Sequence, residues 1–378
     1  MRKLLMCLAM ASFAQAQALA GEVDIAVGPG GQYQHLADAV AVANSDTDPA
    51  NTYVINLAPG VYLNDFPDPI SRPMTIQTDP SIAPTGAVLA ANVALPNQKG
   101  ILLTYAPLTV RGIEITGAFI DDSLGGNGAA IRDQQGAFDL GIPTASLTLD
   151  NVLIDNNQAG VLQGDDTAEV ITIMNSQFIN NGNPDQCCFT HGAYINTAAS
   201  LTVQGSMFCG QLIGHDIKSR AAQTIILNNQ IYSAEGGPPN CQAANTSFDI
   251  DVPNGGVTMI IGNTIVQGPS AQNNKMVEYG GEGLVYANNS ATFATNTFIS
   301  TANSIAIEDL SYLYVTPCIP MVVAADNTFT GVSQVVYPPE CEASAAPPPP
   351  SPPPPPAPPP PPPGTPPQQM HPHHHRHG

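Results

Sequence analysis

Residues 147–152 read Leu-Thr-Leu-Asp-Asn-Val, a short alternation of apolar and polar residues that ends in small polar side chains. The same motif returns at residues 108–112, 171–175, 201–205, 225–229, 259–263, 292–296 and 322–327. Its Asn or Gly recurs at intervals of 24 to 34 residues, at Asn151, Asn175, Gly205, Asn229, Asn263, Asn296 and Asn327. Periods of this length without helical patterning are typical of stacked supersecondary units.

The residue types in the motif indicate which stacked fold this is. Asn and Gly tolerate the left-handed backbone that a sharp bend between strands requires, and stacked Asn side chains can hydrogen-bond along the axis. A propeller would show longer four-strand units with more regular turns. The repeat therefore predicts an all-β fold, a single-stranded, right-handed parallel β-helix.

The beginning of this solenoid has a different pattern. Apolar residues at helical spacing over residues 35–44 predict a short helix that caps the open end, where an unpaired sheet edge would otherwise be exposed. Residues 52–57 read as the first strand after it, and residues 58–62 as the following turn.

These features resemble the pectin-lyase-like superfamily of β-helix proteins, over roughly residues 21 to 327. The cap helix, the strand that ends in Pro59-Gly60-Val61-Tyr62 and the Asn-marked coils carry this resemblance. Three further motifs resemble a group of exported bacterial β-helix proteins whose activity is not established: Thr190-His191 with Tyr194, Gly214-His215 with Lys218-Ser219-Arg220, and Asp251-Val252-Pro253-Asn254-Gly255-Gly256. The resemblance implies a groove for an acidic polysaccharide on the outer face.

The two ends of the chain differ in composition from the repeats. Residues 1–20 read as a secretory signal peptide, because Arg2 and Lys3 precede an apolar run that ends in small residues. Residues 21–344 are expected to form the β-helix domain, and residues 345–378 a disordered Pro-rich linker with a His-rich tail. No later segment is apolar enough to span a membrane. We expect a secreted or periplasmic monomer whose tail contacts the cell envelope.

Six cysteines follow the signal segment, and an even number in an exported protein predicts disulfides. Spacing leaves the pairing open. The pairs considered are Cys318 with Cys341, and Cys209 with Cys187 or Cys188.

The chain is strongly acidic, with a formal net charge of −20. This balance argues against general nucleic-acid binding, which depends on many Lys and Arg. Only seven basic residues lie between residues 21 and 344: Arg72, Lys99, Arg111, Arg132, Lys218, Arg220 and Lys275. Any local cluster of cations is therefore notable.

Two copies of the repeat align without a gap at 24 residues, residues 190–196 on residues 214–220, and the alignment continues to Phe208 and Tyr232. The predicted stacked pairs are His191 with His215, Tyr194 with Lys218, and Asn196 with Arg220.

The second copy carries the strongest candidate for chemistry. Successive strand residues face opposite ways, so an inward Ile217 predicts that Asp216, Lys218 and Arg220 face outward together. In uronate-cleaving lyases of the resembled superfamily, Lys or Arg neutralises the carboxylate and removes the neighbouring proton. The resemblance gives these roles to Lys218 and Arg220, and a base role requires that the pKa of Lys218 be lowered. His215 or Tyr194 would donate the proton. Substrate contacts would come from His191, Asn196, Asp216 and Asp251.

The same residues also have a structural interpretation. Lys218 and Arg220 can form an ion-pair ladder with Asp216, Asp249 and Asp251, and such ladders perturb pKa values without catalysis. His191 and His215 share the parity of Ile217, which favours stacked structural histidines. The protein would then be a non-catalytic envelope or surface β-helix that serves as a rod or binds a glycan.

Two further sites remain open. Asp165 and Asp166, followed by His191-Gly192, offer the paired carboxylates of a glycoside hydrolase, although such a pair is also typical of a turn. Calcium, which uronate lyases use to bridge carboxylates, would take Asp249, Asp251 and Glu278 from adjacent coils as oxygen ligands.

Overall fold

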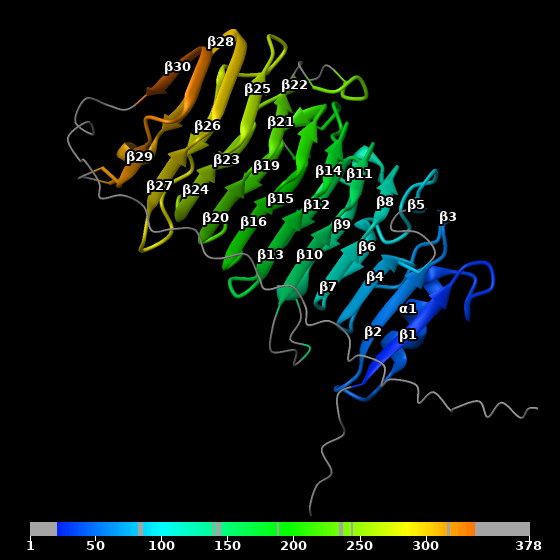
Figure 1. Cartoon of the computed structure of the whole chain (residues 1–378). Coiled ribbons are helices and arrows are strands. Elements are labelled where there is room, and N and C mark those ends of the chain that lie inside the picture. Colours follow the sequence, from blue (N-terminus) through cyan, green and yellow to red (C-terminus); the bar gives the residue numbers. More distant parts are fainter. Residues whose placement is uncertain are drawn as a thin grey trace, which may run out of the picture. The chain divides into compact units, whose positions relative to one another are not determined.

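Strands of this protein stack in parallel into three ladders, and from β4 onward the chain visits the ladders in a fixed order (Figure 1). This arrangement is a parallel β-helix, as predicted. The computed structural model describes residues 21–81, 86–137, 140, 145–186, 189–233, 237–242, 245–315 and 318–336.

Each ladder is made of short strands of three to six residues, apart from two long strands near the end. The first ladder holds β1 (Glu22–Val27), β2 (Thr52–Leu57), β4 (Met74–Thr78), β7 (Leu108–Arg111), β10 (Ser146–Asp150), β13 (Val170–Met174), β16 (Ser200–Gln204), β20 (Gln223–Leu227), β24 (Val257–Ile261), β27 (Ser290–Ala294) and β29 (Met321–Val323). The second holds β3 (Gly60–Leu63), β5 (Ala87–Ala90), β8 (Ile113–Thr116), β11 (Leu153–Asp155), β14 (Gln177–Ile179), β17 (Met207–Cys209), β21 (Gln230–Ser233) and β25 (Thr264–Gln267).

The third ladder holds β6 (Gly100–Thr104), β9 (Ala129–Asp133), β12 (Ala159–Gln163), β15 (Ala193–Ile195), β19 (Ile217–Ser219), β23 (Ile250–Val252) and β26 (Lys275–Tyr279). The long strands β28 (Thr297–Asp309) and β30 (Thr328–Val336) continue the second and third ladders together. A separate short pair is formed by β18 (Ile213–Gly214) and β22 (Asn245–Thr246).

Left-handed residues lie at the bend between the first and second ladders, as predicted for Asn151, Asn175 and Gly205, whereas in the later coils the left-handed residue comes directly before the repeated asparagine. Their φ angles are between 51° and 71°, at Gly112, Asn151, Asn175, Gly205, Asn228, Gly262 and Thr295. Gly and Asn enter this region at low cost, which explains why they mark the repeat.

The residue after each bend is buried, and in the later coils it is an asparagine. The backbone N–H of Asn229 donates to Oδ1 of Asn263 at 2.9 Å, that of Asn263 to Asn296 at 3.0 Å, and that of Asn296 to Asn327 at 2.9 Å. The side-chain amides make parallel bonds along the same line. The predicted hydrogen bonding of stacked Asn along the axis is confirmed.

Apolar residues fill the interior in columns. Ile, Leu and Val from successive coils form one continuous buried cluster, and the rings of Phe178 and Phe208 stack with centroids 4.5 Å apart. Each coil thus places its side chains directly over those of the coil before it.

The predicted N-terminal helix is present as α1 (Leu36–Ser45), next to β1 and β2 (Figure 1). Its apolar face joins the interior of the solenoid through Leu36, Ala39, Val40 and Ala43. The carboxylate of Asp65 accepts hydrogen bonds from the first two helical N–H groups at 2.7 and 3.0 Å, which stabilises the helix N-terminus.

Short 3₁₀ turns occur at η1 (Asp122–Leu124), η2 (Gln135–Ala137) and η3 (Ser311–Leu313). Among the helices described, none combines the length and apolar character needed to cross a bilayer.

The predicted 24-residue register is correct in the third ladder and wrong in the strands that follow. Tyr194 pairs with Lys218, 24 residues later, as predicted. In the second ladder Phe208 pairs with Ile231, and Tyr232 pairs with Cys209, so the offset there is 23. The corner after β19 is one residue shorter than the corner after β15, and this removes one residue from the alignment.

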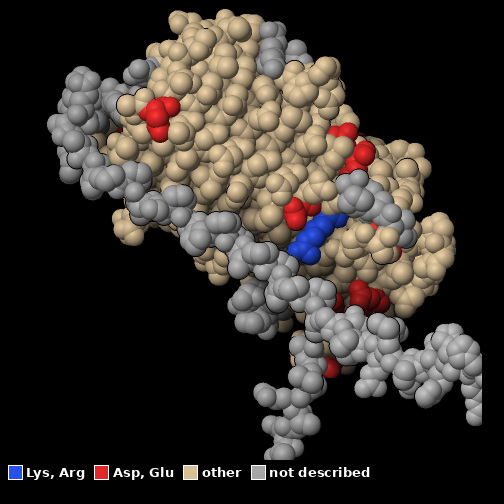
Figure 2. Space-filling view, viewed as in Figure 1, with Lys and Arg blue, Asp and Glu red and all other residues tan. Residues whose placement is uncertain are grey.

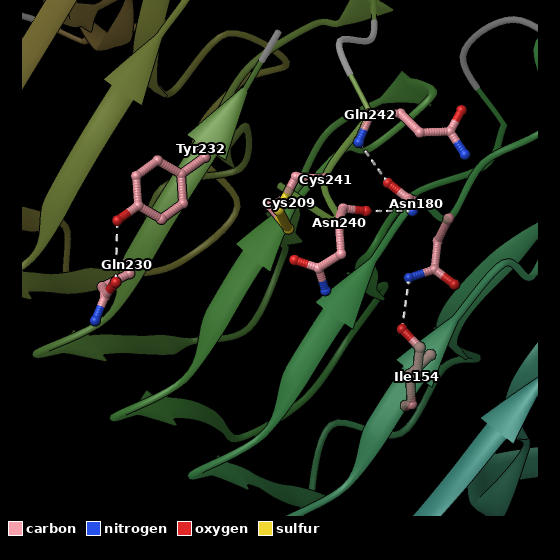
Figure 3. The surroundings of a disulfide bond; sticks show 9 residues. Ile154, Asn180, Cys209, Gln230, Tyr232, Asn240, Cys241 and Gln242 are labelled. Carbon is pink, nitrogen blue, oxygen red and sulfur yellow. Dashed lines mark hydrogen bonds between the residues drawn. A yellow bond between two sulfur atoms is a disulfide. The ribbon is translucent and has the colours of Figure 1, made fainter. Parts of the chain in front are cut away.

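Cys209 forms a disulfide with Cys241, so its predicted pairing with Cys187 or Cys188 is wrong. Figure 3 shows this bond and the side chain of Asn180, which bonds the backbone of the same loop at Asn240 and Gln242. Cys318 is disulfide-bonded, but its predicted partner Cys341 lies outside the described residues.

The asparagine ladder predicts a large effect of one substitution. Asn263→Ala removes an amide that bonds both neighbouring coils and leaves buried partners unsatisfied, so it should lower the free energy of unfolding by about 3 kcal/mol. Urea denaturation measures this change. Asn175→Gly is the control, because Gly occupies the same bend in the next coil at Gly205, and it should change stability by less than about 1 kcal/mol. Equal effects of the two substitutions would contradict this account of the ladder.

Candidate functional site

A cleft of about 940 Å³ follows the outer face of the third ladder. Its floor is one column of in-register residues: Arg132, Leu162, Tyr194, Lys218, Asp251 and Glu278. Neighbouring strands lie about 4.8 Å apart, so this column is roughly 24 Å long. The cleft is therefore elongated along the stack of coils.

Lys218 and Arg220 line this cleft beside Tyr194, as predicted, and both are ion-paired. Lys218 Nζ lies 2.9 Å from Asp251 Oδ2 and 2.8 Å from Glu282 Oε1, and Arg220 Nη2 lies 2.5 Å from Glu282 Oε2. The predicted ion-pair ladder thus exists with Asp251. Its second carboxylate, Glu282, was not predicted, because it belongs to the loop after β26, more than 60 residues along the chain.

These ion pairs decide the protonation of Lys218. Burial alone would lower its pKa, but the carboxylates of Asp251 and Glu282 outweigh burial and raise the pKa above its ordinary value. A Lys218 that stays protonated can neutralise a carboxylate on a ligand. Lys218 cannot act as a base while its ammonium group is ion-paired with both Asp251 and Glu282.

Tyr194 and Asn196 are tied to the same cation. Arg220 Nη1 donates to the hydroxyl of Tyr194 and, at 3.2 Å, to Oδ1 of Asn196, and its guanidinium lies 5.2 Å from the centroid of the Tyr194 ring. The hydroxyl of Tyr194 donates to Asn196 at 2.9 Å. Burial raises the pKa of Tyr194 although Arg220 and Lys218 oppose it, so the phenol keeps its proton at neutral pH. The predicted group of Tyr194, Asn196, Lys218 and Arg220 is therefore assembled.

His191 and His215 also line the cleft, so the prediction that they share the parity of Ile217 is wrong. Strand alternation does not apply here, because β19 begins only at Ile217, and His215 and Lys218 both line the cleft although they are three residues apart. The predicted stack is confirmed, with ring centroids 4.8 Å apart.

The two imidazoles are held neutral. The backbone N–H of His215 donates to Nδ1 of His191 at 3.0 Å, and that of Phe248 donates to Nδ1 of His215 at 3.1 Å. Each ring therefore carries its proton on Nε2. Burial, with Lys218 and Arg220, lowers the pKa of His191 to about 3, and burial likewise places the pKa of His215 well below its ordinary value.

Asp216 does not face the cleft with Lys218, which corrects the predicted outward trio. Asp216 and Asp249, from successive coils, are 1% and 0% exposed. Burial raises the pKa of both carboxyls well above the ordinary value, and the neighbouring Asp249 adds to the shift of Asp216. Burial therefore favours the protonated form of both carboxyls.

The predicted calcium ligands do not fit a metal. Asp249 is buried away from the cleft, and Oδ2 of Asp251 lies against Lys218 and, at 3.4 Å, Nε2 of His215. Glu278 pairs with Asp251 in register but completes no ligand set. Within the part of the chain that the structure describes, no group of three His, Cys, Asp or Glu could hold a metal ion.

Of the two predicted carboxylates, Asp165 lines the cleft and Asp166 does not. Asp165 lines the cleft and accepts hydrogen bonds from the side chains of Asn196 and Thr197. Asp166 accepts from the backbone N–H of Ala168 at 2.9 Å, as in a turn, and is not part of the cleft lining. The pair does not present two carboxylates to one substrate.

Arg132 is a cleft residue that the sequence interpretation missed. It is the one cation of this lining without an ion pair among the described residues, and its buried Nε has no hydrogen-bond partner. Burial lowers the pKa of Arg132, and Tyr105 and Tyr194 oppose this shift. Two signals could have found it: only seven residues of the domain are basic, and it follows the core residue Ile131 on an alternating strand.

Aromatic rings line the cleft around the cations. Phe189 is 67% exposed, and Phe248 lies on the ring of His215 with centroids 5.1 Å apart. With Tyr194 they give the cleft apolar faces among its charged groups. Such a mixture of aromatic faces and a few fixed polar groups is typical of ligand sites.

The cleft residue Gln163 is hydrogen-bonded to a buried pair of carboxyl groups, Glu169 and Asp133. Gln163 accepts from the backbone N–H groups of Asn196 and Thr197 and donates to Glu169 at 2.7 Å. Burial and the neighbouring Asp133 raise the pKa of Glu169 to about 10, so the pair retains a proton at neutral pH. This network fixes the backbone that carries Asn196.

No known family model matches the chain, and no curated protein has a similar sequence. The fold and the cleft together define its class, a parallel β-helix protein with an elongated site on one outer face. Charged side chains are few on the face that Figure 2 shows.

The buried aspartates predict a pH-dependent stability. Unfolded carboxyls lose their protons near pH 4, whereas Asp216 and Asp249 keep theirs in the folded state to a much higher pH. The folded state then binds more protons, so this contribution to stability falls as pH rises. Asp249→Asn needs no proton and should gain stability over the wild type at pH 8 relative to pH 5.

Urea denaturation at both pH values measures this gain. Asp68→Asn is the matched control, because Asp68 is exposed, and its difference from the wild type should not change with pH. A difference for Asp249→Asn that stays constant between pH 5 and pH 8 would show that Asp249 is ionised in the folded protein.

Proposed function

We propose that this protein is exported and binds an acidic polysaccharide along the cleft of the third ladder. The observation that carries the proposal is Arg132, a half-buried guanidinium that forms no ion pair with any carboxylate of the described residues, in a protein of formal net charge −20. A buried, unpaired charge is costly, and a carboxylate on a ligand would satisfy it with two parallel hydrogen bonds.

The shape and lining of the cleft support a polymer as the ligand. The site is elongated along the coils, and it offers aromatic faces at Phe189 and Phe248 between its charged groups. Sugar rings have apolar faces that pack on aromatic rings, while their carboxylates need cations. Arg132 at one position and Lys218 with Arg220 further along match a chain that carries repeated carboxylates.

Cleavage by β-elimination is a second candidate function, and one observation favours it. The hydroxyl of Tyr194, held by Arg220 in the same cleft, keeps its proton and can donate it to a leaving oxygen. Lys218 would abstract the substrate proton, and it becomes a base only when Asp251 and Glu282 no longer stabilise its charge. The resting site therefore favours binding over catalysis.

Substitution of Arg132 tests the binding proposal. Arg132→Gln keeps a polar side chain but removes the charge, and loss of a charged hydrogen bond of about 1.5–3 kcal/mol should weaken binding of a uronate oligosaccharide tenfold or more. Calorimetric titration with galacturonate, mannuronate and glucuronate oligomers measures the affinity. Arg111→Gln is the control, because Arg111 is exposed on the first ladder. This variant should bind the oligomers with the same affinity as the wild type.

The same titrations decide between the functions. Binding of none of the oligomers by the wild type, or equal losses in the two arginine variants, would overturn the proposal. The absorbance of an unsaturated uronate, followed during incubation with the polymers, reports β-elimination. Binding without this absorbance leaves the protein a glycan-binding β-helix.

A further inference from the structure

Glu282 lies in a loop of unusual backbone conformation between β26 and β27. Gly280 and Gly283 on either side of it have φ angles of 79° and 103°, which other residues rarely adopt. The loop backbone is nevertheless fixed. The N–H of Glu282 donates to the carbonyl of Pro253 at 2.9 Å, and the Gly283 carbonyl accepts from the side chain of Asn254 at 3.2 Å.

The side chain of Glu282 extends from this fixed backbone into the cleft. One carboxylate oxygen binds Lys218 at 2.8 Å and the other binds Arg220 at 2.5 Å. The geometry is that of a carboxylate bridging two cations, which is how the carboxylate of a bound uronate would be held.

The two anions that contact Lys218 differ in their exposure. The side chain of Asp251 is 2% exposed and lies next to Lys218 on the following strand of the ladder, whereas the side chain of Glu282 is 45% exposed. Asp251 is therefore a permanent partner. Glu282 can turn toward water by rotating its own side chain, without movement of the loop backbone.

We propose that Lys218 and Arg220 form a second carboxylate subsite, that Glu282 occupies it in the free protein, and that a uronate carboxylate of the bound polysaccharide displaces it. This inference rests on the proposed function, because it assigns part of the same ligand to the same cleft. In the free protein the Arg132 subsite is open to a ligand, whereas the subsite of Lys218 and Arg220 is occupied by Glu282.

The exchange is nearly balanced for the protein. Lys218 keeps Asp251, and Arg220 keeps Tyr194 and Asn196, so neither cation loses all its partners when Glu282 leaves. A partly exposed ion pair contributes little net free energy, and the released Glu282 regains its water. Competition from Glu282 should therefore weaken ligand binding by a modest factor and disfavour ligands without a carboxylate at this position.

Glu282→Gln tests the inference, since Gln has the same shape and no charge. In calorimetric titrations at low salt, it should bind a uronate hexamer about three- to tenfold more tightly than the wild type. Glu22→Gln is the matched control, because it makes the same charge change at an exposed position on β1 and should leave the affinity unchanged. Glu282→Ala gives a second variant, and circular dichroism verifies that each variant is folded.

A second ligand separates charge from shape. A methyl-esterified hexamer has the same sugar chain without carboxylates, so its affinity should be equal for the wild type and Glu282→Gln. An equal gain for both hexamers would mean that Glu282 acts as a steric obstacle and would overturn the subsite.

The outcomes distinguish this inference from the proposed function. If the wild type binds the acid hexamer in an Arg132-dependent manner and neither Glu282 variant binds more tightly, the subsite is wrong and the binding function stands. If the wild type and both Glu282 variants all fail to bind the acid hexamer, the proposed function itself is overturned.

Discussion

Each coil of this protein is hydrogen-bonded in parallel register to its neighbours, and this stacking decides which side chains can meet. A residue lies about 4.8 Å from its partner in the next strand, whatever the two side chains are. Apolar columns and the asparagine ladder benefit from this constraint, because like side chains pack or hydrogen-bond with one another. Charged columns do not benefit, since like charges would repel.

The cleft floor in the third ladder shows where charged residues lie under that constraint. Along the cleft floor a cation is followed by an apolar residue and a tyrosine before the next cation, Lys218, and Lys218 is followed directly by Asp251. Asp216 and Asp249 stack as carboxyls, and burial raises the pKa of both well above its ordinary value. His191 and His215 stack as neutral imidazoles. The stacked histidines line the cleft, which is where violations of ordinary packing are expected to serve function, whereas the two aspartates are buried away from it.

The sequence contained enough information for the fold and for part of the site. The repeated Asn and Gly predict the coils, because one backbone conformation is needed at the same bend in each of them. The group of Tyr194, Asn196, Lys218 and Arg220 followed from two coils of nearly equal length. The alignment failed one corner later, where a single residue is missing, because nothing in the alternating pattern of a strand reports the length of its turn.

Other site residues depended on geometry that the pattern does not carry. Glu282 reaches the cleft from a loop, and Arg132 lies 62 residues before Tyr194 across coils of unequal length. The orientation of His215 was mistaken because alternation was extended past the first residue of β19, into a corner where it does not hold. Disulfide pairing failed for a similar reason, since Cys241 lies in a loop whose path follows from tertiary contacts.

The cations of this cleft fall into two groups: Arg132 has no ion pair among the described residues, whereas Lys218 and Arg220 are already neutralised within the protein. In the proposed function, this division lets the cleft bind carboxylates that are spaced along a polymer. A crystal structure of the protein with a bound uronate oligosaccharide tests it most directly. The account predicts a sugar chain along the third ladder with one carboxylate on the guanidinium of Arg132. A sugar bound on another face, or one in the cleft with Arg132 uncontacted, would contradict it.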